Sequence, residues 1–167
     1  MMPLNVPQWR QRQPGECLAA CAAMVLSYLG EHVAYEQLVQ RLGTSDVGTV
    51  FSHLDRLRSW RLTVERGRGS TELLRQHLAA GRPVIIPVDT ALLPYWLTRS
   101  DLPEDERLTD HAVVVVAIDD LRMYVNDPDF EQVPQVIELG WFQDAWRNFA
   151  QRYAVIRRRW PRRQPQR

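Results

Sequence analysis

The chain of 167 residues contains no lysine, and arginine supplies all 21 of its basic residues. A GC-rich coding bias explains this absence more simply than selection against lysine modification does. Only two cysteines occur, Cys17 and Cys21, which is too few for a disulfide framework or for a metal centre built from cysteine ligands. The formal net charge is only +1 and no nucleic-acid-binding motif is present, so nucleic acid is not an expected partner.

Long apolar runs are also missing from the chain. No segment approaches the run of about 20 apolar residues that a membrane-spanning helix needs, and the first residues lack a signal-peptide pattern. We therefore expect no membrane insertion and a cytoplasmic location. An apolar share of 45% predicts a single globular domain over residues 1–160. Residues 161–167 are basic and interrupted by proline, and we expect a disordered tail there.

The most informative segment covers residues 11–30 and reads QRQPGECLAACAAMVLSYLG. Pro14 and Gly15 predict a turn, and the residues that follow are good helix formers, apolar nearly all round, which predicts a buried helix. Cys17 lies in the first turn of this helix, where the unpaired N–H groups and the helix dipole favour a reactive thiolate. Cys21 lies one turn further on and is expected to be an inert core residue.

A second pattern places a histidine and a carboxylate on two neighbouring strands. A valine-rich strand begins at His111, and a second strand leads back from a turn at Asp119 to Asp127. Paired positions of a hairpin have a constant index sum, which predicts that Asp127 lies opposite His111. The carboxylate would accept the Nδ1 proton and leave Nε2 facing the thiol of Cys17. Taken singly, the two residues could be a strand-end histidine and a turn residue, but together with Cys17 they indicate a thiol hydrolase.

These residues resemble those of a known family. The stretch ECLAACAAMVLSYLG, with Glu16 before the cysteine and Gln11 six positions upstream of it, resembles the nucleophile helix of the double-glycine leader peptidases, which process bacteriocins in bacteria. His111 at the head of a valine-rich strand and Asp127 before a proline are similar as well. The resemblance implies a papain-like α+β fold and a triad of Cys17, His111 and Asp127. It also implies an oxyanion held by the Gln11 amide. We expect no cofactor, and we expect no metal because the chain has no further cysteine to complete a metal site.

The resemblance extends from about residue 8 to residue 157 and departs from the family at one position. Family members usually have glycine directly after the nucleophile, whereas this chain has Leu18. A side chain there is expected to narrow the substrate slot or to change its preference. Leu18, Glu16 and Asp110 are therefore predicted to contact substrate, and the long acidic loop over residues 89–110 is expected to be a surface loop or a binding loop.

The implied activity is hydrolysis of a peptide or protein after small residues. Gln11 is preferred for the oxyanion on its spacing, with Gln8 and Gln13 as alternatives. Acyl or peptidyl transfer by the same triad and a non-catalytic peptide-binding regulatory domain are alternatives that the residues leave open. Family members are typically fused to an export transporter, so a separate transporter or a precursor peptide is an expected partner.

Hydrophobic patterns predict further elements in addition to those already described. Helices are expected over residues 16–29, 35–42, 47–59, 71–80 and 141–148. Strands are expected over residues 61–65, 83–88, 111–118, 122–126, 135–139 and 152–157. Helices in the first half and strands in the second half favour an α+β fold in which a helical half faces a sheet.

Overall fold

The computed structural model describes residues 2–99, 101 and 110–159. The expected tail at 161–167 and much of the acidic loop, at 100 and 102–109, lie outside the described residues. The helical elements are α1 (Cys17–Tyr28), α2 (Tyr35–Leu42), the 3₁₀ helix η1 (Phe51–Trp60), α3 (Thr71–Ala79), the short 3₁₀ turn η2 (Thr90–Leu92), α4 (Pro94–Leu97) and α5 (Leu139–Arg147). The strands are β1 (Leu62–Arg68), β2 (Val84–Asp89), β3 (Asp110–Ile118), β4 (Arg122–Asn126), β5 (Gln135–Glu138) and β6 (Arg152–Arg158).

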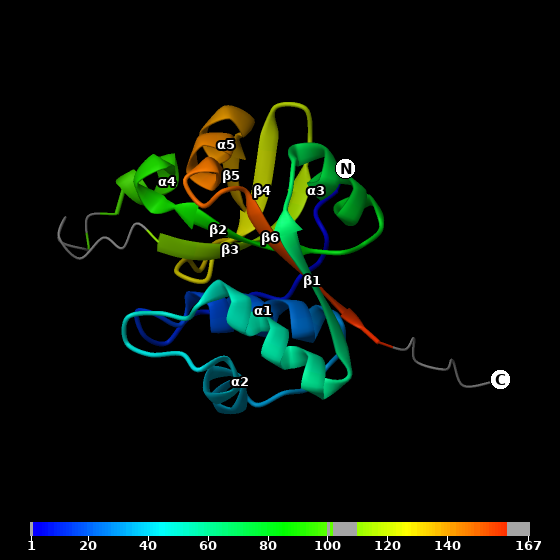
Figure 1. The fold of residues 1–167 in the computed structure, drawn as a ribbon. Helices are drawn as coiled ribbons and strands as arrows, with labels where there is room; N and C mark the ends of the chain where they lie inside the picture. The colour runs from blue at the N-terminus through cyan, green and yellow to red at the C-terminus, as the bar shows by residue number, and fades with distance from the viewer. Residues whose placement is uncertain (1, 100, 102–109, 160–167) are drawn as a thin grey trace.

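The six strands form one antiparallel sheet in the order β1-β6-β2-β3-β4-β5. Helices α1 and α2 lie with η1 on one side of this sheet, while α3 and α5 lie on the other (Figure 1). This arrangement confirms the predicted α+β architecture, with the N-terminal helices packed on the sheet. None of the described helices is both long enough and apolar enough to cross a membrane.

Burial of both faces of the sheet explains the valine run of β3. Alternate side chains of a strand point to opposite faces. Val114 and Val116 pack in the core beneath α1 and α2, whereas Val113 and Val115 pack in the second core beneath α3 and α5. A strand covered on both faces needs apolar residues at every position, and the sequence accordingly shows no polar alternation there.

The predicted helix over 47–59 is wrong in type and in start. The structure has a turn at residues 45–48, and the helix that follows is the 3₁₀ element η1. Four large apolar residues of η1 recur at every third position, namely Phe51, Leu54, Leu57 and Trp60. A 3₁₀ helix has three residues per turn, so this spacing keeps all four on one face. Leu54 and Leu57 are fully buried there, and the other two pack against the same core.

The segment expected as a loop over 89–110 contains structure in its first part. It forms η2 and then α4, which begins at Pro94, a residue suited to the first turn of a helix. Trp96 of α4 is buried in the second core. The described first part of the segment is therefore anchored to the sheet rather than being only a solvated loop.

The hairpin of β3 and β4 forms as predicted, but its register differs. A bulge lies between Val115 and Ala117, and Val114 pairs with Asn126. Asp127 follows the end of β4 and would continue the ladder level with Val113 rather than with His111. The prediction fails because the turn is centred further along the chain than Asp119, since Ile118 pairs with Met123. The bulge then changes the index sum by only one residue.

A substitution at Gly15 tests whether the turn before α1 depends on close packing of its backbone. It has a φ of +89°, and a Cβ at this position would lie 2.6 Å from the carbonyl oxygen of Ser45. We expect Gly15→Ala to lower the free energy of unfolding by at least about 2 kcal/mol, because the added Cβ would displace the backbone of the turn at residues 45–48. The matched control is Gly140→Ala on α5, where a Cβ meets nothing within 4 Å. That change should raise stability by about 0.5–1 kcal/mol in the same urea titration, and equal effects at both sites would contradict this account.

Candidate active site

Cys17 and His111 line the same cavity, although they are far apart in the chain. Cys17 is the first residue of α1 and is partly exposed, and His111 lies at the start of β3 with 4% exposure. The cavity has a volume of about 380 Å³, and Gln11 and Asp110 also form part of its wall. The helix start, the strand start and the turn before α1 therefore meet at one opening.

The imidazole of His111 hydrogen-bonds the carboxylate of Asp127, with His111 Nε2 2.8 Å from Asp127 Oδ1. This corrects the expected use of Nδ1 for the carboxylate. Asp127 is not directly opposite His111 in the strand pairing, and its carboxylate contacts Nε2, the ring nitrogen further from the His111 backbone. The thiol of Cys17 interacts with the same imidazole, for which Nδ1 is the remaining nitrogen.

Four donors hold the Asp127 carboxylate, which is completely buried. Oδ2 accepts hydrogen bonds from the Tyr95 hydroxyl at 2.7 Å and from Trp96 Nε1 at 2.9 Å. Oδ1 accepts one from the backbone N–H of Asp129 at 2.9 Å, in addition to the bond with His111. Burial alone would raise the pKa of Asp127, but the His111 charge and the hydrogen bonds from His111, Asp129 and Tyr95 lower it.

Sequence reasoning missed Tyr95 and Trp96. The sequence did contain an indication, because a tyrosine and a tryptophan stand next to each other in an otherwise acidic segment. When such side chains are buried, the hydroxyl or the indole N–H usually donates to a buried acceptor. Desolvation and the charge of Asp127 raise the pKa of Tyr95 well above its usual range, so its hydroxyl stays protonated and can donate. The Trp96 ring also meets the His111 ring edge-on, with centroids 4.9 Å apart.

The same environment controls the charge of His111. Burial alone would lower the pKa of His111, but the charge and hydrogen bond of Asp127, together with Cys17, raise it well above the ordinary range. The arrangement therefore favours an imidazolium beside the thiol at neutral pH. Cys21 is fully buried, and desolvation raises its pKa well above the usual value, which keeps that thiol protonated.

The three glutamines near Cys17 are placed differently. The Gln11 side chain lies in the wall of the cavity, and its backbone N–H bonds the carbonyl of Pro128 at 2.9 Å. Gln8 Nε2 donates to the backbone carbonyl oxygens of Asp127 at 2.7 Å and of Phe130 at 2.8 Å, so its amide is committed to the turn. Gln13 is exposed and lines a separate outer cavity.

The residues predicted to contact substrate also differ in position. Leu18 is 2% exposed and packs in the core, so its position does not support the expectation that it narrows the slot. Glu16 Oε2 accepts hydrogen bonds from the Arg12 backbone N–H and from the Tyr35 hydroxyl, both at 3.1 Å, and thereby ties the segment before α1 to α2. Asp110 is on the cavity wall, and partial burial raises its pKa. Of the three, Asp110 lines the cavity.

Metal ligation has no evident place in the part of the chain that the structure describes. Within those residues, no group of three or more histidine, cysteine, aspartate and glutamate side chains is positioned to hold a metal ion.

The fold is similar to that of several solved peptidases. A C39-like peptidase from Bacillus anthracis is 21% identical with a TM-score of 0.72, over 92% of this chain and 96% of that one. A double-glycine-motif protease from an AMS/PCAT transporter, solved in complex with the leader peptide, is 23% identical with a TM-score of 0.69, over 92% of each chain. The peptidase domain of Streptococcus ComA, a bifunctional ABC transporter involved in quorum sensing, is 15% identical with a TM-score of 0.68, over 89% of this chain and 95% of that one.

Comparison with curated proteins gives no match. The model of the Peptidase C39-like family, in contrast, matches residues 3–158, which is nearly the whole chain. The resemblance to the double-glycine peptidases is thereby confirmed at the level of family and fold, and this chain belongs to the Peptidase C39-like family of papain-like fold.

Proposed function

We propose that this protein is a cysteine peptidase in which Cys17 is the nucleophile, His111 the acid and base, and Asp127 the group that orients His111. The observation that carries the proposal is the buried hydrogen bond of 2.8 Å between His111 and Asp127, with the imidazole in the cavity that Cys17 lines. A nucleophile, a base and a group that orients the base are the parts that nucleophilic catalysis requires.

The first step is attack by the sulfur of Cys17 on the carbonyl carbon of the substrate. A carbon–sulfur bond forms, and the carbonyl oxygen becomes an oxyanion. The Gln11 amide and the Cys17 backbone N–H donate to that oxyanion, since an N–H in the first turn of a helix lacks an intrahelical acceptor. When the intermediate collapses, the carbon–nitrogen bond breaks and His111 gives its proton to the departing amine.

The second step releases the acyl group from the enzyme. His111, now neutral, takes a proton from a water molecule that attacks the thioester carbonyl. The carbon–sulfur bond then breaks, and the sulfur of Cys17 leaves as a thiolate that again pairs with the imidazolium. Attack by an amine instead of water would transfer the acyl group, and the product of the reaction distinguishes the two outcomes.

The substrate we propose is an extended peptide segment that is cut after a small residue. Support comes from the family resemblance and from a relative of similar fold that was solved with a leader peptide. A narrow slot beside a nucleophile discriminates by steric exclusion, which rejects large side chains sharply. A precursor peptide that carries such a segment is the partner we propose.

Removal of the nucleophile is the first test. We expect wild type to cleave a peptide that contains a Gly-Gly or Gly-Ala pair, and Cys17→Ala to reduce kcat/KM by at least about a thousandfold, because no other group can form the thioester. Cys21→Ala is the matched control and should retain activity, since Cys21 is a buried core residue. Product mass identifies hydrolysis or transfer.

Two results would contradict different parts of the proposal. Cleavage that is equal in Cys17→Ala and wild type would remove Cys17 as the nucleophile. Cleavage of a peptide library by wild type after large or charged residues, with full dependence on Cys17, would remove only the preference for small residues.

The oxyanion role of Gln11 gives a second test. We expect Gln11→Ala to lower kcat by about a hundredfold or more, with little change in KM, because the lost donor acts on charge that develops in the transition state. Gln13→Ala is the control, since Gln13 is exposed and should leave kcat unchanged. A larger loss of kcat in the Gln13 variant than in the Gln11 variant would reverse the assignment.

The hydrogen bond from Tyr95 to Asp127 gives a test that depends on pH. A hydrogen bond to a carboxylate favours its charged form, so Tyr95→Phe should raise the pKa of Asp127. The acid limb of the kcat/KM profile should then move to higher pH, by about one unit. Tyr28→Phe removes a hydroxyl that bonds the carbonyl of Gly81 instead, and its profile should match wild type. Identical profiles for Tyr95→Phe and wild type would show that this contact does not tune the site.

A further inference from the structure

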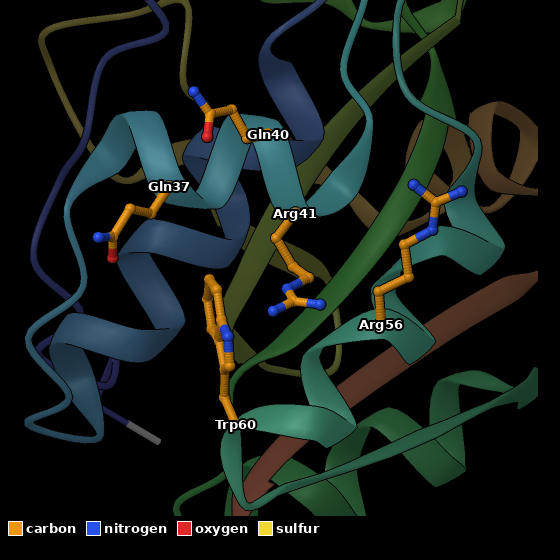
Figure 2. Close-up of a pocket in the computed structure, with 5 residues that line it drawn as sticks. All are labelled: Gln37, Gln40, Arg41, Arg56 and Trp60. Carbon is orange, nitrogen blue, oxygen red and sulfur yellow. The ribbon is translucent and has the colours of Figure 1, made fainter.

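A second cavity lies between α2 and η1, outside the cavity of Cys17. It has a volume of about 580 Å³, and its lining is formed by Gln37, Gln40, Arg41, Arg56 and Trp60 (Figure 2). Two guanidinium groups, two amides and an indole thus surround one opening, and the lining described contains no carboxylate. None of these side chains takes part in the proposed catalysis.

The indole of Trp60 positions the first guanidinium. The Cζ atom of Arg41 lies 5.3 Å from the centre of the Trp60 ring, a distance suited to a cation–π contact. Figure 2 shows the Arg41 side chain extending from α2 toward Trp60 at the end of η1. Trp60 itself packs against the first core, so Arg41 rests on a fixed surface.

A histidine and a glycine position the second guanidinium. Arg56 Nη2 lies 3.1 Å from His53 Nε2, and His53 Nδ1 lies 2.8 Å from the carbonyl oxygen of Leu42. Because a guanidinium only donates and a carbonyl only accepts, Nε2 is the acceptor and Nδ1 carries the proton. Arg56 also packs over Gly43, where a Cβ would come within 2.6 Å of Nη1.

The positive charge of this cavity is not neutralised by the described residues. Within them, neither Arg41 nor Arg56 forms an ion pair, while the carboxylates of Glu36 and Asp55 are engaged by other arginines. The two guanidinium groups do not converge, because Arg41 lies beside Trp60 and Arg56 extends away from it (Figure 2). Each is a planar fork of the kind that donates two N–H groups to a carboxylate.

The second cavity is adjacent to the cavity of Cys17. Gly43 and Val50 line the Cys17 cavity, while Arg56 packs against Gly43 and Val50 directly precedes η1. Gly43 therefore lies at the border between the two cavities.

We propose that Arg41 and Arg56 form a binding site for an acidic side chain of the polypeptide substrate, at a position away from the scissile bond. This inference rests on the proposed peptidase function. The site holds the substrate through charge–charge contact and contributes to ground-state affinity, whereas the groups around Cys17 act on the bond that is cut. Trp60 and His53 are positioning residues for the two guanidinium groups.

The test measures binding and cleavage separately. A series of peptides shares one background sequence with a Gly-Gly pair, and each peptide carries a single Glu at a different distance from that pair. A matched peptide has Gln in place of each Glu. One Glu position should give a Kd for Cys17→Ala about five- to tenfold tighter than its Gln counterpart does. Adding Arg41→Gln and Arg56→Gln should abolish that difference, and so should high salt. In the wild-type background the same pair of changes should raise KM for the Glu peptide and leave kcat unchanged.

Controls separate the possible outcomes. Arg147→Gln on α5 removes the same charge on the opposite side of the sheet and should keep the Glu preference, and thermal unfolding checks that each variant folds. In Arg56→Glu, a Lys peptide should bind better than the Glu peptide. Equal Kd for Glu and Gln peptides at every position overturns the inference, as does arginine-dependent binding of inorganic phosphate alone. Absence of cleavage by wild type overturns the proposed function, while the Kd comparison still decides this site.

Discussion

Asp127 is a fully buried carboxylate, and the arrangement of the site depends on how its charge is compensated. An unpaired buried charge costs several kcal/mol, so the chain has to bring donors to it. The donors come from three segments. Tyr95 and Trp96 belong to α4, the Asp129 N–H belongs to the turn after β4, and His111 belongs to β3. Segments distant in the sequence are thereby joined at one carboxylate, and the orientation of the imidazole follows from that junction.

The sheet supplies the frame on which this junction is built. Strand β3 is an inner strand that is covered on both faces, and His111 lies near its start. The position of His111 is therefore fixed by the packing of the strand. Helix α1 is buried against the same strand and presents Cys17 at its N-terminal end. The hydrogen bond between Glu16 and Tyr35 ties the segment before α1, which carries Gln11, to the start of α2. Cys17 and His111 are thus held by elements that pack in the core.

Local patterns in the sequence predicted most of the elements and placed Cys17, His111 and Asp127 near one another. Their catalytic roles stay predictions. The predicted strand register was wrong because the turn of the hairpin is centred beyond Asp119, and neither the turn centre nor the bulge in β3 can be read from the apolar pattern. Trp96 was missed because its partner lies 31 positions away, beyond the reach of local periodicity. The 3₁₀ helix was readable in principle, since the large apolar residues of η1 recur at every third position.

The central claim is that the buried carboxylate of Asp127 keeps His111 in the imidazolium form beside Cys17. A titration of the ¹⁵N signals of His111 in labelled protein tests it most directly, with Asp127→Asn as the comparison; the chain has only four histidines. The account predicts that both ring nitrogens stay protonated well above pH 6.5, the ordinary histidine value, and that this protonation is lost in Asp127→Asn. A ring that titrates at or below that value in wild type would contradict the account.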